Sequence, residues 1–119
     1  MNQYEVPALI ADQFPETSAD IVYQSTIGNI YHTMSVLSHF MRKKVIAHQF
    51  NKVFKCLRLA DYIYANGNTE VKTAVENTFI YSFSQVSQSC NRKEWDLVKA
   101  HIPVPLYTIY IRQVIGYGS

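Results

Sequence analysis

The chain contains 119 residues, of which 48% are hydrophobic and 17% are charged, and its formal net charge is +2. A chain of this length can bury a core of its own, and this composition is typical of a globular domain rather than of a disordered segment. The small net charge gives no general reason to expect a nucleic-acid partner. We therefore expect one globular domain.

The cysteine content and the first residues indicate the compartment. Cys56 and Cys90 are too few for a disulfide framework, and Cys56 falls in an apolar helical stretch that predicts a buried free thiol. Residues 1–5 have no basic segment followed by an apolar run, so no signal peptide is visible. No uninterrupted apolar run approaches the roughly 20 residues of a spanning helix. We expect a cytoplasmic protein that does not enter a membrane.

Residues 6–14 predict a short first helix. Pro7 fits its first turn, where the missing N–H costs nothing, and Phe14 precedes a proline, a position that avoids the helical region. Residues 17–20 have the spacing of a capping box, with Asp in place of the usual Glu. Residues 21–26 fit either a helix or an extended chain. The side chains expected to contact the core are Ala8, Leu9, Ala11 and Phe14.

Two longer amphipathic stretches follow, at residues 27–47 and residues 50–65. Their apolar side chains recur at steps of three and four, which places them on one stripe of a helix. One continuous rod would be ~58 Å long, too long for a compact domain of this size, so we expect two antiparallel helices with a turn near residues 47–51. The first stripe comprises Ile27, Ile30, Tyr31, Met34, Leu37, Met41 and Val45. The second comprises Phe50, Val53, Phe54, Leu57, Ala60 and Tyr64.

The strongest break in the chain is at residues 65–68. Gly67 can take the left-handed conformation that ends a helix, and Asn68 can cap the next helix by accepting hydrogen bonds from its free N–H groups. Asn91 and Glu94 resemble a second capping box, which opens a short helix. The helix between these points is expected to bury Val71, Ala74, Val75, Thr78, Phe79, Phe83 and Val86. The short helix carries Trp95, Leu97 and Val98.

Pro103 and Pro105 predict an extended kink before the last helix, which we expect at residues 106–115, ended by Gly116. Together the amphipathic stretches predict an all-α fold, because each apolar stripe must pack against other helices. The expected architecture is a compact bundle of about five to six helices, mostly antiparallel, forming a single helical domain over residues 1–119. The last helix is expected to bury Leu106, Ile109, Tyr110 and Val114.

No pattern of reactive side chains indicates a reaction. His32 and His39 are seven residues apart, so ~10.5 Å of helix separates them, too far for one zinc ion without other ligands. Asp61 borders an apolar stripe, where we expect an ion pair or a hydrogen bond to a tyrosine rather than a catalytic base. No second carboxylate completes an acid–base pair at a readable spacing. We expect no catalytic residue, no metal and no cofactor.

Charge is distributed unevenly along the chain. Residues 42–58 carry six basic side chains and no acidic one, whereas residues 1–20 carry four acidic side chains and no basic one. Three explanations of this asymmetry stay open. The acidic and basic segments neutralise each other or face solvent, the basic segment binds an acidic protein surface, or the basic segment binds nucleic acid. The nine tyrosines favour a protein partner, because tyrosine is enriched at interfaces. The six basic residues, called the basic corner below, are Arg42, Lys43, Lys44, Lys52, Lys55 and Arg58.

Four segments of the chain carry a family resemblance: QFPE at residues 13–16, CLRLADYIY at residues 56–64, NGN at residues 66–68 and VENTFIYS at residues 75–82. In these segments the chain resembles a small family of helical bacterial proteins of uncharacterised function. These segments are structural rather than catalytic. Small single-domain families of this kind include immunity proteins, which neutralise the toxins of neighbouring bacteria. The resemblance therefore implies an immunity-protein-like role.

The leading hypothesis is a non-enzymatic protein-binding module, an immunity protein that neutralises a bacterial toxin. Two alternatives stay open: a nucleic-acid-binding regulator that uses the basic corner, and an enzyme with a cryptic site near Asp61. Arg58 and Tyr62, one helical turn apart, are of the residue types that dominate binding energy at interfaces. We expect the partner, a toxin or effector with an acidic surface, to bind at Arg42, Lys43, Lys44, Lys52, Lys55, Arg58 and Tyr62.

Overall fold

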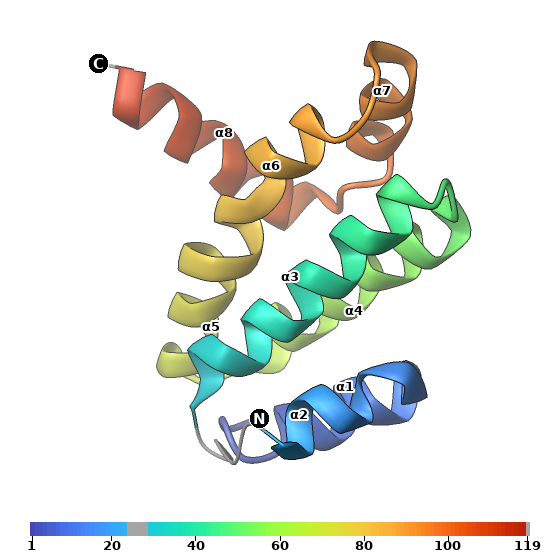
Figure 1. Cartoon of the computed structure of the whole chain (residues 1–119). Helices are drawn as coiled ribbons and strands as arrows, with labels where there is room; N and C mark the ends of the chain where they lie inside the picture. The colour runs from blue at the N-terminus through green and yellow to red at the C-terminus, as the bar shows by residue number, and fades with distance from the viewer. Residues whose placement is uncertain (24–28, 119) are drawn as a thin grey trace.

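The computed structural model describes residues 1–23 and 29–118, and every regular element in those ranges is helical (Figure 1). The expected all-α fold is confirmed, although the described residues form eight α-helical segments and three short turns of other helical types, more than the five to six helices expected. In chain order the elements are α1 (Val6–Gln13), η1 (Pro15–Thr17), α2 (Ser18–Tyr23), α3 (Ile30–Ile46), α4 (Phe50–Asn66), α5 (Thr69–Ala74), η2 (Val75–Phe79), η3 (Ile80–Ser82), α6 (Phe83–Gln88), α7 (Arg92–Ala100) and α8 (Val104–Gly118).

Helices α3 and α4 form an antiparallel hairpin, as expected (Figure 1). α3 begins at Ile30 because the Asn29 side chain caps it, accepting a hydrogen bond from the backbone N–H of His32 at 3.2 Å. Residues 47–49 separate the two helices, and His48 among them has a positive φ of 58°. The buried stripes of the hairpin are Met34, Leu37, Met41 and Val45 on α3, and Val53, Leu57, Ala60 and Ile63 on α4.

The edges of the predicted stripes are less buried than expected. Tyr31 is 44% exposed, because it lies about 100° around the helix from the buried Ile30. Phe54 and Tyr64 are half-buried at the margin of the core. Ile27 lies outside the described residues.

The N-terminal segment, α1 to α2, packs across α3. Phe14 anchors this segment: its side chain is buried, and its ring centroid lies 4.7 Å from that of Phe40. The expected burial of Ala8 is wrong, because Val6 and Ile10 face the core and leave Ala8 exposed.

The capping box expected at residues 17–20 does not form among the described residues. Thr17 lies in the 3₁₀ turn η1, where it is buried and its hydroxyl donates a hydrogen bond back to the Phe14 carbonyl at 2.7 Å. Residues 21–23 belong to α2, so this part of the ambiguous stretch is helical, and residues 24–26 lie outside the described residues.

Gly67 forms the corner between α4 and α5, but not in the left-handed conformation expected. Its φ of −75° and ψ of 153° are extended. The corner requires glycine because of space: a Cβ atom there would lie 2.5 Å from Cγ1 of Val71 and 2.8 Å from the Ile63 carbonyl oxygen. The predicted cap is confirmed, because the Asn68 side chain accepts a hydrogen bond from the Val71 N–H at 2.9 Å.

The helical run from Thr69 to Gln88 changes type along its length. The α-helical turns of α5 widen into the π-helical η2, tighten into the 3₁₀ turn η3 and return to α-helix in α6. The run packs against α3, chiefly through η2. The predicted stripe is buried except at Thr78, which is half-buried, and Ile80 joins the core unexpectedly. Both departures follow from the change of helical period at η2.

Helix α7 begins with the expected capping box. The Asn91 side chain accepts from the Glu94 N–H at 2.8 Å, and the Glu94 carboxylate accepts from the Asn91 N–H at 2.9 Å. Val98 is buried as expected, whereas Leu97 is 42% exposed because the neighbouring position faces away from the core. Trp95 is half-buried against the core.

Helix α8 begins and ends differently from the prediction. It starts at Val104, because Pro105 occupies the first turn of the helix and needs no N–H partner there. It continues to Gly118, past the expected end at Gly116.

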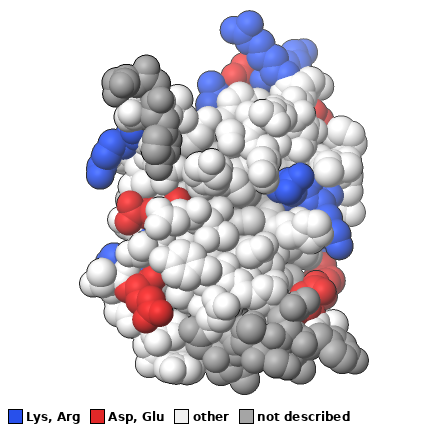
Figure 2. All heavy atoms as spheres, turned by 60° about the vertical axis from the view of Figure 1, so that its left-hand side comes forward, with Lys and Arg blue, Asp and Glu red and all other residues white. Residues whose placement is uncertain are grey.

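The buried side chains of α8 lie in its first half, whereas in the second half Gln113 is half-buried and its Nε2 donates to the Glu76 carbonyl at 2.9 Å. Leu106 and Ile109 are buried, but Val114 is 52% exposed, because the second half extends away from the rest of the molecule (Figure 1). On the face seen in Figure 2, charged residues lie around the margin and the centre is uncharged. No helix in the described part of the chain is both long and apolar enough to cross a membrane.

Candidate functional site

The outer face of α3 carries a polar row bordered by two hollows. His32, Ser35, His39 and Arg42 follow one another at steps of three and four residues, so they lie on one side of the helix. One hollow, of about 350 Å³, lies between α3 and the η1–α2 segment, and the other, of about 270 Å³, lies between α3 and residues 77–85. Ser35 and His39 line both hollows, so the two are adjacent.

The first hollow has charges of both signs. Glu16 and Asp20 line it from the N-terminal segment, and Lys43 and Lys44 line it from α3. This mixture gives the first hollow no clear preference for a ligand of either charge.

The second hollow has one formal charge, that of Arg42. The Nε of Arg42 is buried and has no hydrogen-bond partner among the described residues, as is also true of Nε2 of His32, which lines the first hollow. Since most buried polar atoms in proteins are hydrogen-bonded, these two atoms mark the face of α3 as unusual.

Two lysines of the basic corner are engaged within the chain. Lys52 Nζ lies 3.1 Å from Oε2 of Glu16, and Lys55 Nζ donates to the Gln13 carbonyl at 3.2 Å while lying 5.1 Å from the centre of the Phe14 ring. The pKa of Glu16 is lowered, chiefly by a hydrogen bond from a backbone N–H and next by the hydrogen bond from the Lys52 side chain. At these positions the acidic N-terminal segment and the basic corner meet each other.

The rest of the proposed partner-binding set is spread over two helices. Lys43, on α3, and Arg58, on α4, are exposed, and the side chain of neither makes an ion pair or hydrogen bond with another described residue. Tyr62 lies one turn after Arg58 and is 53% exposed. Lys44 lies over the Phe40 ring, 5.0 Å from its centre. Arg58 and Tyr62 are therefore the members that present an open, adjacent pair.

The structure also shows where the candidate reactive groups lie. The described residues contain no group of three or more metal-binding side chains, and Asp61 is half-buried without the expected hydrogen-bond or ion-pair partner in that part of the chain. Solvent reaches the Asp61 carboxylate, which removes the need for such a partner.

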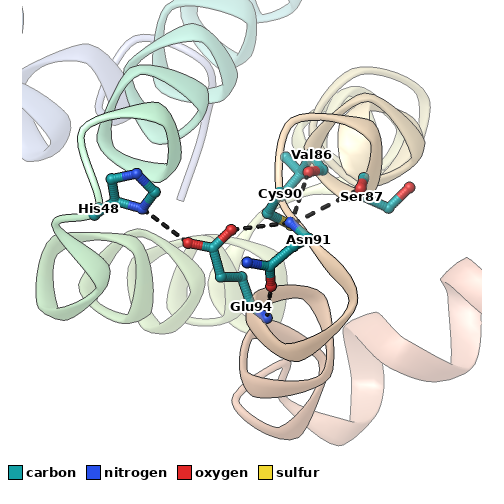
Figure 3. Close-up of polar contacts among 6 residues, drawn as sticks. All are labelled: His48, Val86, Ser87, Cys90, Asn91 and Glu94. Carbon is teal, nitrogen blue, oxygen red and sulfur yellow. Dashed lines mark hydrogen bonds and ion pairs between the residues drawn. The ribbon is translucent and has the colours of Figure 1, made fainter.

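A cysteine, a histidine and a glutamate approach one another where the α3–α4 turn meets α7 (Figure 3). The Nδ1 of His48 lies 2.8 Å from Glu94, whereas the Cys90 thiol donates to the Val86 carbonyl at 3.2 Å. Burial, and secondly the Glu94 charge, raise the pKa of Cys90, which favours the unreactive thiol. The imidazole contacts the carboxylate and not the sulfur, so this cluster joins two parts of the fold.

The sequence predicts Arg42 as a partner-binding residue but does not predict the opposite wall of the hollow that Arg42 lines. That wall comes from η2 to α6 and includes Asn77, Thr78, Tyr81 and Gln85. The spacing of apolar residues gives no signal for it, because that spacing does not distinguish a π-helical turn from the α-helix on either side. π turns in helices occur frequently at functional sites.

Fold and surface together define a small all-α domain whose distinctive groups lie on polar faces rather than in a deep apolar cleft. The chain belongs to the family described as Domain of unknown function (DUF7674), whose sequence model matches residues 7–116. No curated protein and no solved structure matches the chain.

Proposed function

We propose that this DUF7674 domain is a non-enzymatic, cytoplasmic protein-binding module, and that it acts as an immunity protein by neutralising a bacterial toxin. The observation that supports binding is the exposed pair of Arg58 and Tyr62 on α4, whose side chains make no ion pair or hydrogen bond with another described residue. Arginine and tyrosine are the residue types that most often supply the energetic anchors of interfaces. The neutralising role is proposed from the resemblance to immunity-protein families.

The chemistry of the partner follows from the charge of this surface. Arg58 and Lys43 are exposed cations, so the partner presents acidic side chains to them. Such charges act mainly on the association rate and are screened by salt, whereas a buried tyrosine acts mainly on dissociation. Lys52 and Lys55 are less suitable probes of the interface, because each already contacts the N-terminal segment.

The test begins with a pull-down from the source cell, using the whole chain as bait. Association of the recovered partner is then measured for Arg58→Glu, with Lys93→Glu as a control of equal charge change at an exposed position on α7. The Arg58→Glu variant is expected to associate more slowly, more so at low salt, and Tyr62→Ala is expected to dissociate faster. Equal effects of Arg58→Glu and Lys93→Glu would place the interface elsewhere.

Two further results would reject parts of the proposal. Recovery of nucleic acid and no protein, with affinity that falls steeply as salt rises, would replace the protein-binding function by the regulator hypothesis. A recovered partner whose toxicity in co-expression is unchanged by the chain would keep the binding function and reject neutralisation.

A further inference from the structure

The hollow between α3 and residues 77–85 is lined by polar side chains only. Nine residues line it, and none is apolar or acidic. Arg42 contributes the one formal positive charge, and His39 is the other titratable group with a cationic form. A site with this charge pattern attracts anions and has no carboxylate to repel them.

Most of the lining groups have hydrogen-bonding capacity that the protein itself does not use. Ser38 and Ser82 donate their hydroxyl protons to backbone carbonyls within their own helical turns, to Met34 at 3.0 Å and Phe79 at 2.6 Å. The side chains of the other lining residues make no hydrogen bond to a described residue, and they are Ser35, His39, Arg42, Asn77, Thr78, Tyr81 and Gln85. Donor groups from two separate helical runs therefore converge without partners.

Arg42 is the group for which the missing partner matters most. Its Nε is shielded from solvent, so water does not replace the absent hydrogen bond. A guanidinium offers its N–H groups in a flat fork that matches the two oxygens of a carboxylate or a phosphate. Arg42 lines the hollow, so a group bound there lies beside its side chain.

The helix geometry explains how the opposite wall is built. Asn77 and Thr78 lie in the π-helical η2, and Tyr81 lies in the 3₁₀ turn η3 that follows. The widened turn brings an amide and a hydroxyl to face the α3 side of the hollow, while Phe79 stays buried behind them. Amide and hydroxyl groups can donate hydrogen bonds to the ligand oxygens that the arginine does not contact.

We propose that this hollow binds a small ligand through an oxyanion group, a carboxylate or a phosphate, with Arg42 as its central donor. The volume of about 270 Å³ suits a small anion or the anionic end of a metabolite. The site is separate from the Arg58 and Tyr62 surface, so it does not depend on the proposed protein partner.

The direct test is NMR titration of the whole chain with inorganic phosphate and, separately, with succinate, each at constant ionic strength. The ¹⁵N–¹H signal of Arg42 Nε is expected to shift saturably, together with the side-chain amide signals of Asn77 and Gln85. A saturable shift with only one of the two anions would identify the ligand class as a phosphate or a carboxylate, and either result would support the site. No saturable shift with either anion would overturn the proposal.

Variants separate a site from a general charge effect. Arg42→Gln is expected to weaken anion binding about tenfold or more, because hydrogen bonds to charged groups are worth at least that factor. Arg92→Gln, an equal charge change at an exposed position on α7, is expected to leave binding nearly unchanged. If both variants weaken binding equally, the anions bind by net charge and the proposal fails. Arg42→Lys keeps the positive charge but lacks the flat pair of N–H donors, so it is expected to bind the anion with reduced affinity. This variant replaces Arg42→Gln in the test if Arg42→Gln does not fold.

Discussion

Lys52 on α4 lies 3.1 Å from the carboxylate of Glu16 in η1, and this ion pair fastens the acidic N-terminal segment to the basic corner. Both side chains are about half exposed, so the pair is weak and screened by salt. Lys55 donates a hydrogen bond to the carbonyl of Gln13, the last residue of α1. The two lysines of α4 together hold the N-terminal segment at the point where the chain leaves α1.

The first prediction concerns this pair. Lys52→Glu is expected to lower the urea midpoint of unfolding, because two carboxylates would then face each other, and the exchange Glu16→Lys with Lys52→Glu is expected to restore most of the loss. The pKa of Glu16 is lowered in the folded state, so its contribution is present above its usual value of 4.5 and lost as the pH falls below it. A double variant as unstable as Lys52→Glu alone would show that the two residues are not coupled.

The second prediction tests the core of α4. Leu57 is fully buried, so Leu57→Ala is expected to lower the free energy of unfolding by about 2–5 kcal/mol. Leu97→Ala is the matched control, because Leu97 is 42% exposed on α7 and its truncation is expected to cost about 0.5 kcal/mol or less. Chemical denaturation of both variants measures the difference, and equal losses would contradict the assignment of Leu57 to the core.

The third prediction concerns His48, whose φ of 58° is unfavourable for a residue with a Cβ atom. His48→Gly relieves that conformation but removes the contact with Glu94, a pair in which the histidine is 69% exposed. An exposed pair contributes about 0–1 kcal/mol, whereas a left-handed residue costs about 1–2 kcal/mol. We expect the glycine variant to be as stable as the parent or slightly more so in thermal unfolding, and His48→Val to be clearly less stable.

The fourth prediction distinguishes the two cysteines. Burial raises the pKa of Cys56 from 9.0 to about 12. Between these pH values the folded state keeps the thiol proton and the unfolded state loses it. Stability is therefore expected to fall by about 1.4 kcal/mol per pH unit as the pH rises above 9. The Cys56→Ala variant is expected to have a lower free energy of unfolding at neutral pH, but to lose less of it as the pH rises above 9.

Thiol labelling provides an independent check on the same residue. At neutral pH, a water-soluble reagent is expected to modify the half-buried Cys90 slowly in the folded protein, because its raised pKa favours the thiol, and to reach Cys56 only on unfolding. Rapid labelling of Cys56 in the folded protein would contradict its buried position.

The helices could be predicted from the sequence because local patterns encode them. The stripe through Met34 and Leu37, and the caps at Asn68 and Asn91, are signals carried by residues within one or two turns of each other. The conformation of Gly67 could not be predicted in the same way, since its requirement arises from a contact with Val71 and not from its own dihedral angles.

The candidate sites were harder to predict than the helices. Charge alone groups Lys52 and Lys55 with Lys43 in the sequence. In the structure the N-terminal segment, which is distant in sequence, contacts Lys52 and Lys55 but not Lys43. The sequence predicts Arg42 as a partner-binding residue and gives no signal that Asn77 lies near it, because only the packing of η2 on α3 brings the two to one hollow.

The widened turn at η2 has a consequence for changes in chain length. A π-helical turn accommodates one residue more than the α-helix around it while the helices on either side keep their faces toward the core. Loss of Asn77 would therefore turn the bulge into ordinary helix and leave Val71 and Val86 in place, whereas a deletion inside α4 would rotate every later side chain by about 100°. The loss of one residue is therefore absorbed at the wall of the polar hollow, whose shape would change while the core beside it is kept.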